Sequence, residues 1–472
     1  MTAASGRSAE KGLAPVPDHW EWWDGSPLPE SGELRWGYTT GAAAAAALTA
    51  SLLALKGQAE DSVPLLFGDG ATRGIPLDPP DAAWPGWTRV RKNGGDDPDC
   101  THGLVVYGRL TLLDGIPPVG GADTGAGARS DAGTGAGPDT GSDERDIELA
   151  AKAARVRLHC VSGVGVCTRD GLDCRKGRWA VNPGVLAMLA ANLARAGIGE
   201  GLWLAEIAIP EGAALAAKTL NRTLGIEGGL SLLGTTGLVR PFSHEAYMAT
   251  VRVCLRAAAR AGRTAVLCTG RRTLQSAREW CLARCEGSGT DDLPRLPDHM
   301  DETSFVSIAD FVGESLRAAR AFALERIIVC CMPGKLLKYA AGHDNTHAHK
   351  VGQDMALLAE RLGLLYPERP ELAAAALACP SMRQAMEMLD AAGQEAVIAD
   401  LAALALPRFL RLCRDPAKEG EAQAPPPSFA LLLTDFSGRV TRLVPDRTFL
   451  ADADGLDTPS PTPSHSLPGQ QD

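Results

Sequence analysis

The chain has 472 residues, 45% of them hydrophobic, and a formal net charge of −10 with a pI near 5.5. This length predicts two domains plus irregular segments. The acidic balance argues against a nucleic-acid partner, because a nucleic-acid-binding surface needs a basic face, but a local pocket can still bind an anionic small molecule.

The N-terminal segment carries no pattern typical of export or membrane insertion. Residues 1–23 have no apolar core of signal-peptide length, and the longest apolar run, 41–55, is too short and too rich in alanine to span a bilayer. We therefore expect a cytoplasmic protein without a membrane partner. Residues 1–32 are rich in Pro, Gly and Trp, which predicts a flexible arm.

An α+β domain is predicted over residues 33–240. Its first helix is expected at the alanine run 42–47, because alanine has the highest intrinsic helix propensity and the hydroxyl of Thr39 or Thr40 can cap the helix start. Such a start also favours anions. The segment 117–144 has too few large apolar side chains to offset its ordering entropy, which predicts a disordered insertion.

Strand patterns in this domain alternate with a helical pattern. Strands are predicted at 104–113, 154–161 and 203–210, and a helix is predicted at 184–197. Asn182-Pro183 favours a helix start there, since proline fits the first helical turn.

A second, α/β domain is predicted over 241–450, followed by a disordered tail at 451–472. Helical patterns alternate with short buried strands, which indicates a mostly parallel, doubly wound sheet. The end of this domain, 429–444, has the pattern of a hairpin. Ligands of such sheets bind at the carboxyl ends of the strands, which directs attention to the loops at 270–272, 310–313 and 333–335. The chain has neither a GxGxxG fingerprint nor a P-loop, so a kinase or ATPase is disfavoured.

The twelve cysteines show no Cys-x-x-Cys motif and no compact disulfide framework. In a cytosolic enzyme we expect them to be buried, reduced thiols.

The densest polar cluster is the loop RKNGGDDPDCTHG at 91–103. Three carboxylates, Asp96, Asp97 and Asp99, repel one another unless a cation, a base or solvent intervenes. His102 follows, just before a strand. The cluster predicts either a solvated acidic turn or part of a site.

A histidine-rich segment, GHDNTHAHK at 342–350, allows two interpretations. His343, His347 and His349 could ligate a metal, although no HExxH motif is present. Alternatively, the segment binds a polar ligand through Asn345, Thr346 and His347, with Lys335 nearby in sequence.

Several of these segments, in this order, resemble the cobalt-precorrin-5B (C-1)-methyltransferase family of cobalamin biosynthesis, known as CbiD. The resemblance covers roughly 33–445, with Asn93 and Gly94 standing where the family usually has Asp and Ala. The matching segments are GYTTG (37–41), KNGGDDPDCTHG (92–103), GVGVCTRDGL (163–172), AVNPG (180–184), TLNRTLGIEGGLSLLGTTGLVRPFS (219–243) and MPGKLLKYAAGHDNTH (332–347).

The resemblance implies methyl transfer from S-adenosylmethionine to ring carbon 1 of cobalt-precorrin-5B, giving cobalt-precorrin-6A, with no protein-bound metal. The first domain would bind the corrinoid and the second the methyl donor, with the pocket between them. A homo-oligomer is compatible with the sequence. The alternatives are a metal-dependent hydrolase that uses His343, His347 and His349, and a non-catalytic corrinoid carrier.

The resemblance, together with the chemistry of the residues and the loops at the carboxyl ends of the predicted parallel strands, suggests roles for individual residues. The catalytic candidates, any of which could remove a proton from the macrocycle, are His102, Asp97 and His347. The residues expected to bind the substrate are Thr39, Thr40, Lys92, Thr101, Asn182, Thr235, Thr236 and Arg240. The residues expected to bind the cofactor are Asp310, Gly313, Gly334, Lys335, Asn345 and Thr346.

Overall fold

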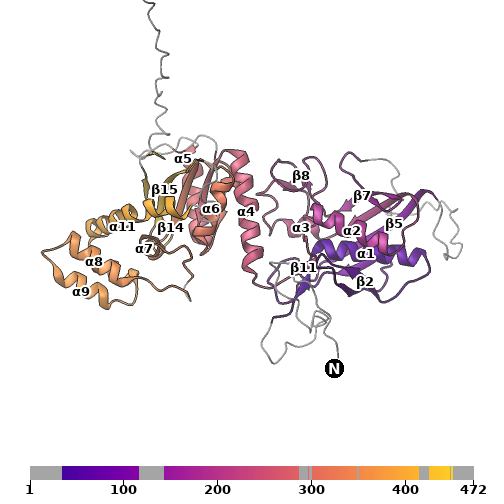
Figure 1. Cartoon of the computed structure of the whole chain (residues 1–472), viewed down its shortest axis with the longest axis horizontal. Coiled ribbons are helices and arrows are strands. Elements are labelled where there is room, and N and C mark those ends of the chain that lie inside the picture. The colour runs from indigo at the N-terminus through magenta and orange to yellow at the C-terminus, as the bar shows by residue number, and fades with distance from the viewer. Residues whose placement is uncertain are drawn as a thin grey trace, which may run out of the picture. The chain divides into compact units, whose positions relative to one another are not determined.

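The structure is a computed structural model that describes residues 34–115, 143–285, 296, 300–347, 350–413, 425–446 and 448–449. The predicted arm and tail, and the predicted insertion apart from Asp143 and Glu144, lie outside the described residues. The chain divides into two compact units, with the boundary between Ala246 and Tyr247 (Figure 1). No helix among the described residues has the length and apolar character needed to cross a membrane.

The first unit is built around an alanine-rich helix, α1 (Thr40–Leu55), as the alanine run predicts. Thr39 is the N-cap, and its side chain accepts a hydrogen bond from the Ala42 amide. Every residue from Thr40 to Leu52 is buried, so the helix is enclosed on all sides. The small side chains let strands approach closely, and the Thr88 hydroxyl donates to the Ala47 carbonyl at 2.5 Å.

One face of a five-stranded mixed sheet packs against α1. Its order is β4-β5-β9-β7-β6, with β9 parallel to β7 and antiparallel to β5. The strands are β4 (Thr88–Arg91), β5 (Val105–Gly115), β6 (Ile147–Ala151), β7 (Ala154–Ser162) and β9 (Gly201–Ala208). Alternate side chains of β7 and β9 enter the same core as the alanines of α1.

The other elements of this unit are short, apart from α2 (Pro183–Arg195), which packs against α1 and starts at the predicted Asn182-Pro183. β2 (Ser62–Leu66) and β3 (Thr72–Pro76) form a hairpin. Two small ladders tie distant segments together. They pair β1 (Gly37–Tyr38) with β11 (Leu238–Val239), and β8 (Val166–Cys167) with β10 (Ile226–Glu227). A short helix, α3 (Gly212–Ala216), follows β9.

The second unit contains the predicted parallel sheet. Its order is β13-β12-β14-β15-β16, in which the first four strands are parallel and only β16 runs antiparallel, as the second arm of the predicted hairpin. The strands are β12 (Thr264–Cys268), β13 (Phe305–Ser307), β14 (Arg326–Cys331), β15 (Ser428–Thr434) and β16 (Val440–Pro445).

Helices cover both faces of this sheet. α5 (Arg271–Cys285) packs on one face, while α4 (His244–Ala261), α6 (Val312–Ala321), α7 (Pro333–Ala340) and α11 (Ala391–Leu412) contribute to the core on the other. β13 and β14 flank β12 on opposite sides, so the winding reverses between β12 and β14. Ligands of doubly wound sheets bind outside the carboxyl ends of strands at such a point. The fold class predicted for the chain is confirmed.

Four elements of the second unit lie outside the sheet and its immediate cover. A 3-10 helix, η2 (Glu302–Ser304), precedes β13, and α8 (Met355–Leu365) packs side by side with α9 (Pro370–Ala378) (Figure 1). α10 (Met382–Met386) packs near α7 and leads into α11.

The cysteines require one correction. Ten are free, but Cys167, at the end of β8, forms a disulfide with Cys174 in the loop that follows. The expectation of reduced thiols throughout is therefore wrong for this pair. Two cysteines separated by seven positions face each other because the loop turns back on itself, which their spacing alone does not reveal.

Candidate active site

Four segments that are distant in sequence come together in the first unit: 35–41, 92–103, 182–184 and 233–243. Backbone hydrogen bonds hold two of them in register, because the Thr39 amide donates to the Gly237 carbonyl at 2.9 Å and the Gly41 amide donates to the Leu233 carbonyl at 3.1 Å. The two Thr-Thr-Gly sequences, 39–41 and 235–237, therefore lie next to each other.

Glycines allow the backbones of these segments to touch. A Cβ at Gly37 would collide with the backbone of Asn93 and Gly94. A Cβ at Gly184 would lie 2.8 Å from the Cα of Thr235. Since real Cβ atoms do not approach other atoms so closely, these positions require glycine for steric reasons.

Two helix N-termini, those of α1 and α2, adjoin the 233–237 loop. Thr39 caps α1, and the Asn182 side chain caps α2 by accepting from the Gly184 amide at 2.9 Å. The partial positive charges at two adjacent helix starts favour anionic groups. The two helix N-termini beside the 233–237 loop are thus suited to binding carboxylates.

Asp96 is a structural carboxylate of the acidic loop. It accepts from Nε of Arg35 at 2.9 Å, from its Nη2 at 2.7 Å and from its backbone amide at 2.7 Å. Burial would raise the pKa of Asp96, but the hydrogen bonds and charge of Arg35 lower it overall.

Asp99 is also committed to an internal contact. The ammonium group of Lys92, whose side chain is 2% exposed, donates to Asp99 at 2.5 Å and to the Thr101 hydroxyl at 2.7 Å. Burial opposes ionisation of Asp99, yet Lys92 and Thr101 lower its pKa. The burial of Lys92 and Thr101 counts against their predicted contact with a substrate, and that role stays a prediction.

Asp97 and His102 are the groups of this loop with capacity for chemistry. Among the described residues, the Asp97 carboxylate accepts a hydrogen bond from the Phe242 amide at 3.3 Å. Nδ1 of His102 accepts from the Gly94 amide at 3.1 Å, so a neutral His102 carries its proton on Nε2. The ring of His102 is exposed and can donate from Nε2, whereas Asp97 can accept a proton.

The remaining predicted substrate residues of this unit differ in their contacts. The Thr40 hydroxyl is buried and accepts from the Leu233 amide at 3.4 Å. Thr235 is exposed, and the Thr236 hydroxyl accepts from the Leu238 amide at 3.3 Å. Arg240 is exposed, and its guanidinium lies 5.7 Å from the centre of the Trp36 ring.

In the second unit, several predicted cofactor residues meet near the carboxyl ends of β13 and β14. Lys335 forms an ion pair with Asp310, and its ammonium donates to the Thr346 hydroxyl at 2.8 Å. The Thr346 hydroxyl also contacts the Asp310 carboxylate at 3.1 Å. Burial raises the pKa of Asp310, but the ion pair with Lys335 outweighs this and lowers it.

Gly313 and Gly334 serve close packing in this region. The Gly313 amide donates to the Asp344 carbonyl at 2.8 Å, and a Cβ at Gly334 would lie 2.8 Å from the Gln353 side chain. α7 starts beside Gly334 without a capping side chain. Its first turn therefore retains the positive end of the helix dipole.

The histidine segment is only partly described. Asn345 accepts from the His347 amide at 3.0 Å, whereas His349 lies outside the described residues. Among the residues that the structure describes, His343 and His347 belong to no cluster of metal-ligating groups. The predicted catalytic role of His347 stays a prediction.

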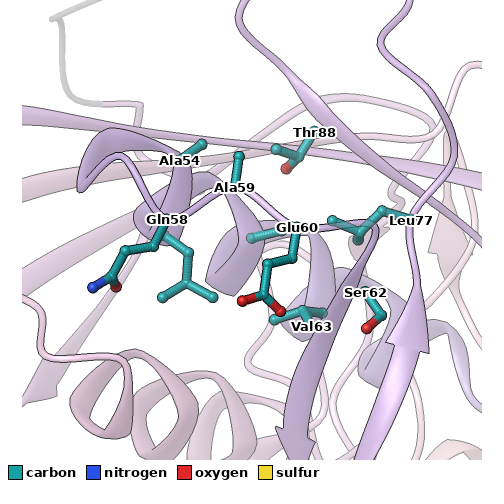
Figure 2. Close-up of a pocket in the computed structure, with 10 residues that line it drawn as sticks. Ala54, Gln58, Ala59, Glu60, Ser62, Val63, Leu77 and Thr88 are labelled. Atoms are coloured by element: carbon teal, nitrogen blue, oxygen red, sulfur yellow. The ribbon is translucent and has the colours of Figure 1, made fainter. Parts of the chain in front are cut away.

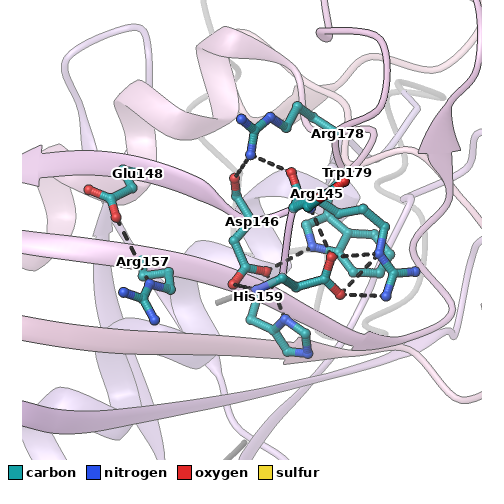
Figure 3. A network of polar contacts seen from close by, with 9 residues as sticks. Arg145, Asp146, Glu148, Arg157, His159, Arg178 and Trp179 are labelled. Atoms are coloured by element: carbon teal, nitrogen blue, oxygen red, sulfur yellow. Dashed lines mark hydrogen bonds and ion pairs between the residues drawn. The ribbon is translucent and has the colours of Figure 1, made fainter. Parts of the chain in front are cut away.

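A polar network beside β6 and β7 contains the grouping Asp143, Asp146 and His159, whose potential ligand atoms lie within 4.8 Å of one another (Figure 3). Its members already have partners. Asp143 pairs with Arg145, and Asp146 contacts Nδ1 of His159 at 2.8 Å. Arg145 also stacks on Trp179, so the network joins the start of β6 to the loop before α2.

A small cavity lies at the opposite end of α1 from Thr39 (Figure 2). It measures about 50 Å³ and is lined by Ala50, Leu53, Ala54, Gln58, Ala59, Glu60, Ser62, Val63, Leu77 and Thr88. Such a volume holds no more than a few water molecules, so this cavity is not the site.

Sequence reasoning missed three residues of the first-unit site: Arg35, Trp36 and Phe242. Arg35 fixes Asp96, Trp36 lies beside Arg240, and Phe242 binds Asp97 through its amide. Arg35 and Trp36 directly precede the GYTTG segment, and Phe242 lies near the end of the 219–243 segment, so these positions beside or within the matching segments were the available signal.

The chain matches known proteins over the part that contains this site. The family model of CbiD matches residues 28–241. A cobalt-precorrin-5B C(1)-methyltransferase of Pelobacter propionicus is 33% identical over 343 residues, which cover 70% of this chain and 79% of that protein. Proteins of the same name from Burkholderia cenocepacia (strain HI2424) and Burkholderia mallei are 33% and 34% identical, and the matches cover 77% and 78% of their lengths.

A crystal structure of the cobalamin biosynthesis protein CbiD from Archaeoglobus fulgidus is also similar, at 22% identity, with 67% of this chain and 83% of that chain covered and a TM-score of 0.32. That TM-score is too low to support an argument, so the assignment rests on the family model and the curated relatives. The chain belongs to the CbiD family of cobalt-precorrin-5B C(1)-methyltransferases.

Proposed function

We propose that this protein methylates carbon 1 of cobalt-precorrin-5B, with S-adenosylmethionine as the methyl donor, in cobalamin biosynthesis. The observation that carries the proposal is the convergence of 35–41, 92–103, 182–184 and 233–243 within the stretch that matches the CbiD family. These segments overlap four of the six stretches whose sequences resemble the family, and they form one polar cluster.

The first unit would bind the macrocycle. A corrin precursor carries acetate and propionate groups around its rim, and the two helix N-termini beside Thr235 suit such anions. Arg240, Thr235 and Thr236 would complete the contacts, since all three lie on the 233–243 segment. The net charge of −10 does not oppose this, because local fields decide the affinity of a site.

The second unit would bind the methyl donor near the carboxyl ends of β13 and β14. The groups there fit the methionine part of the donor: the uncapped start of α7 suits its carboxylate, and Asp310 suits its ammonium group. When bound, the donor supplies an electrophilic methyl group on a sulfonium. The protein then contributes approach geometry and exclusion of water.

Asp97 is the residue best placed to accept a proton from the macrocycle if methylation requires one to leave. Asp96 and Asp99 are held by Arg35 and Lys92, whereas Asp97 accepts only the Phe242 amide among the described residues. His102 would donate a hydrogen bond from Nε2 to a rim carboxylate. His347 remains a catalytic candidate of the second unit.

The test is turnover with a labelled donor. Purified protein is incubated with cobalt-precorrin-5B and S-adenosylmethionine carrying a ¹³C methyl group, and the macrocycle is analysed by mass spectrometry. We expect a mass increase of one labelled methyl group and an equal amount of S-adenosylhomocysteine. Binding of the macrocycle without label would show a carrier and contradict the proposal.

A further inference from the structure

Phe242 combines two features that are costly for a large apolar residue. The residue is 72% exposed, the highest exposure among the large hydrophobic residues that are exposed in the described part of the chain. Its backbone φ is 52°, in the left-handed region that disfavours bulky side chains. Conformations of this kind persist only where the surrounding structure imposes them, and they concentrate at functional sites.

Asp97 contacts the backbone of Phe242 directly. Its carboxylate accepts a hydrogen bond from the Phe242 amide at 3.3 Å, and the bond joins the 92–103 loop to the 233–243 segment across 145 positions of sequence. The neighbouring Pro241 is buried, so the backbone is anchored on the N-terminal side as well. The ring is thereby held out from the surface beside the predicted base.

The surroundings of Phe242 indicate what the ring would contact. The same segment carries the exposed Thr235 and Arg240, and the latter lies over Trp36. A flat, conjugated ligand with carboxylates on its rim would place its rim on the cationic and amide groups and its face on an aromatic ring. Stacking of a conjugated ring on an aromatic side chain needs an exposed ring that is already oriented.

We infer that Phe242 binds the face of the tetrapyrrole macrocycle and that Asp97 is the positioning residue that orients it. This inference rests on the proposed function and extends it by naming the contact that selects a planar ring over other polycarboxylates. Asp97 has two separable roles: a carboxylate oxygen accepts the hydrogen bond from the Phe242 amide, and the ionised carboxylate accepts a proton.

The experiment uses the full-length chain and cobyrinic acid, a stable corrinoid with free carboxylates, in a fluorescence-quenching titration. Phe242→Gly removes the ring, while glycine accepts a positive φ without strain. We expect this variant to bind cobyrinic acid about ten-fold more weakly, because stacking contacts contribute on the order of a ten-fold change in affinity, and to unfold at the wild-type temperature or above. Phe242→Tyr should retain wild-type affinity.

Lys152→Gly is the matched control. Lys152 also has a positive φ, of 54°, in the turn between β6 and β7. Its replacement should leave the affinity unchanged. Citrate is a polycarboxylate without a conjugated ring. If the Phe242 ring contributes stacking and does not affect binding of the carboxylates, the inhibition constant of citrate should be the same for wild type and Phe242→Gly.

Asp97→Asn separates the two tasks of Asp97. The asparagine oxygen can still accept the Phe242 amide, so cobyrinic acid should bind with wild-type affinity while kcat for labelled-methyl transfer falls. Asp97→Ala should lose both the wild-type affinity for cobyrinic acid and the methyl-transfer activity. Unchanged affinity in Phe242→Gly, with wild type binding cobyrinic acid, would overturn the inference and leave the proposed function intact, whereas no binding by wild type would count against the proposed function itself.

Discussion

Lys92 and Arg91 are adjacent cations that differ in burial. The Lys92 side chain is 2% exposed and pairs with Asp99, while the Arg91 side chain is 55% exposed and pairs with Asp78. Removing one partner of a buried pair leaves the other charge uncompensated, whereas an exposed pair is largely replaced by solvent. The same substitution at the two positions therefore has different consequences.

Lys92→Met should lower the free energy of unfolding by about 2 kcal/mol, because the Asp99 side chain left behind is 31% exposed and partly solvated, and Arg91→Met by less than about 0.5 kcal/mol. Urea unfolding followed by circular dichroism measures both. Equal effects at the two positions would show that Lys92 does not hold the acidic loop, and its predicted contact with substrate would regain support.

Asp96 gives the first unit a defined acid sensitivity. Its pKa is lowered in the folded protein, so its contribution to stability is complete above the unfolded-state pKa of about 3.9 and is lost as the pH falls through the lower folded value. Asp96→Asn removes the titrating group. The variant should be less stable than wild type at neutral pH, and the difference should shrink on acidification.

Urea unfolding at a series of pH values down to about 2.5 tests this prediction on the scale of the carboxyl pKa. Asp61→Asn serves as a control, because Asp61 is exposed and its side chain forms no ion pair with another described residue. Parallel pH curves for wild type and Asp96→Asn would mean that Arg35 and Asp96 do not interact in solution.

At the level of elements, the start of α2 illustrates a glycine kept for packing. Alanine normally stabilises a helix relative to glycine by about 0.8 kcal/mol. At Gly184, however, a Cβ would lie 2.8 Å from the Cα and 3.0 Å from a side-chain methyl of Thr235, so the 233–237 loop would have to move. Gly184→Ala should therefore destabilise the protein and weaken cobyrinic acid binding.

Gly363 in α8 provides the matched comparison. A Cβ there would lie 3.9 Å from the Ala373 side chain, which is ordinary van der Waals contact. Gly363→Ala should stabilise the protein by about 0.8 kcal/mol. Thermal unfolding of the two variants should therefore give shifts of opposite sign, and a positive shift for Gly184→Ala would exclude the close contact between α2 and the loop.

The regular elements were predictable because their signals are local. The alanine run with its threonine cap predicts α1, Asn182-Pro183 predicts the start of α2, and the alternation of helices with buried strands predicts the parallel sheet. The disulfide between Cys167 and Cys174 was not predictable, because it depends on the path of a loop whose residues lack a periodic pattern.

The site was predictable only in part. The segments of the site could be identified from their glycines and threonines and from the resemblance to a family. Which carboxylate of the acidic loop contacts which partner could not be predicted. That Asp96 pairs with Arg35, that Asp99 pairs with Lys92, and that Asp97 holds Phe242 follows from chain folding over 61, 7 and 145 positions. Of these three contacts, only the pair of Asp99 and Lys92, which lie in one loop, could have been predicted from sequence spacing.

At the scale of the whole molecule, the proposed division of labour assigns one ligand to each compact unit. The groups proposed to bind carboxylates gather around Thr235 and Thr236 in the first unit, and the Asp310–Lys335 pair lies beyond the carboxyl ends of β13 and β14 in the second. If each unit binds its own ligand, substitutions in one unit should change the affinity for one ligand only.

Isothermal titration with cobyrinic acid and with S-adenosylmethionine, performed separately on full-length variants, tests this division. Thr235→Val combined with Thr236→Val should weaken cobyrinic acid binding about 100-fold and leave the donor affinity within two-fold, because the two lost hydrogen bonds to charged groups together contribute about 3 kcal/mol. Asp310→Asn should have the reverse effect, since it removes the carboxylate proposed to contact the donor's ammonium group. Loss of both affinities in either variant, with an unchanged unfolding temperature, would place the two ligands on shared residues and contradict the division. Unchanged affinities in the double threonine variant would mean that the two hydroxyls only support the local backbone structure and do not bind a ligand.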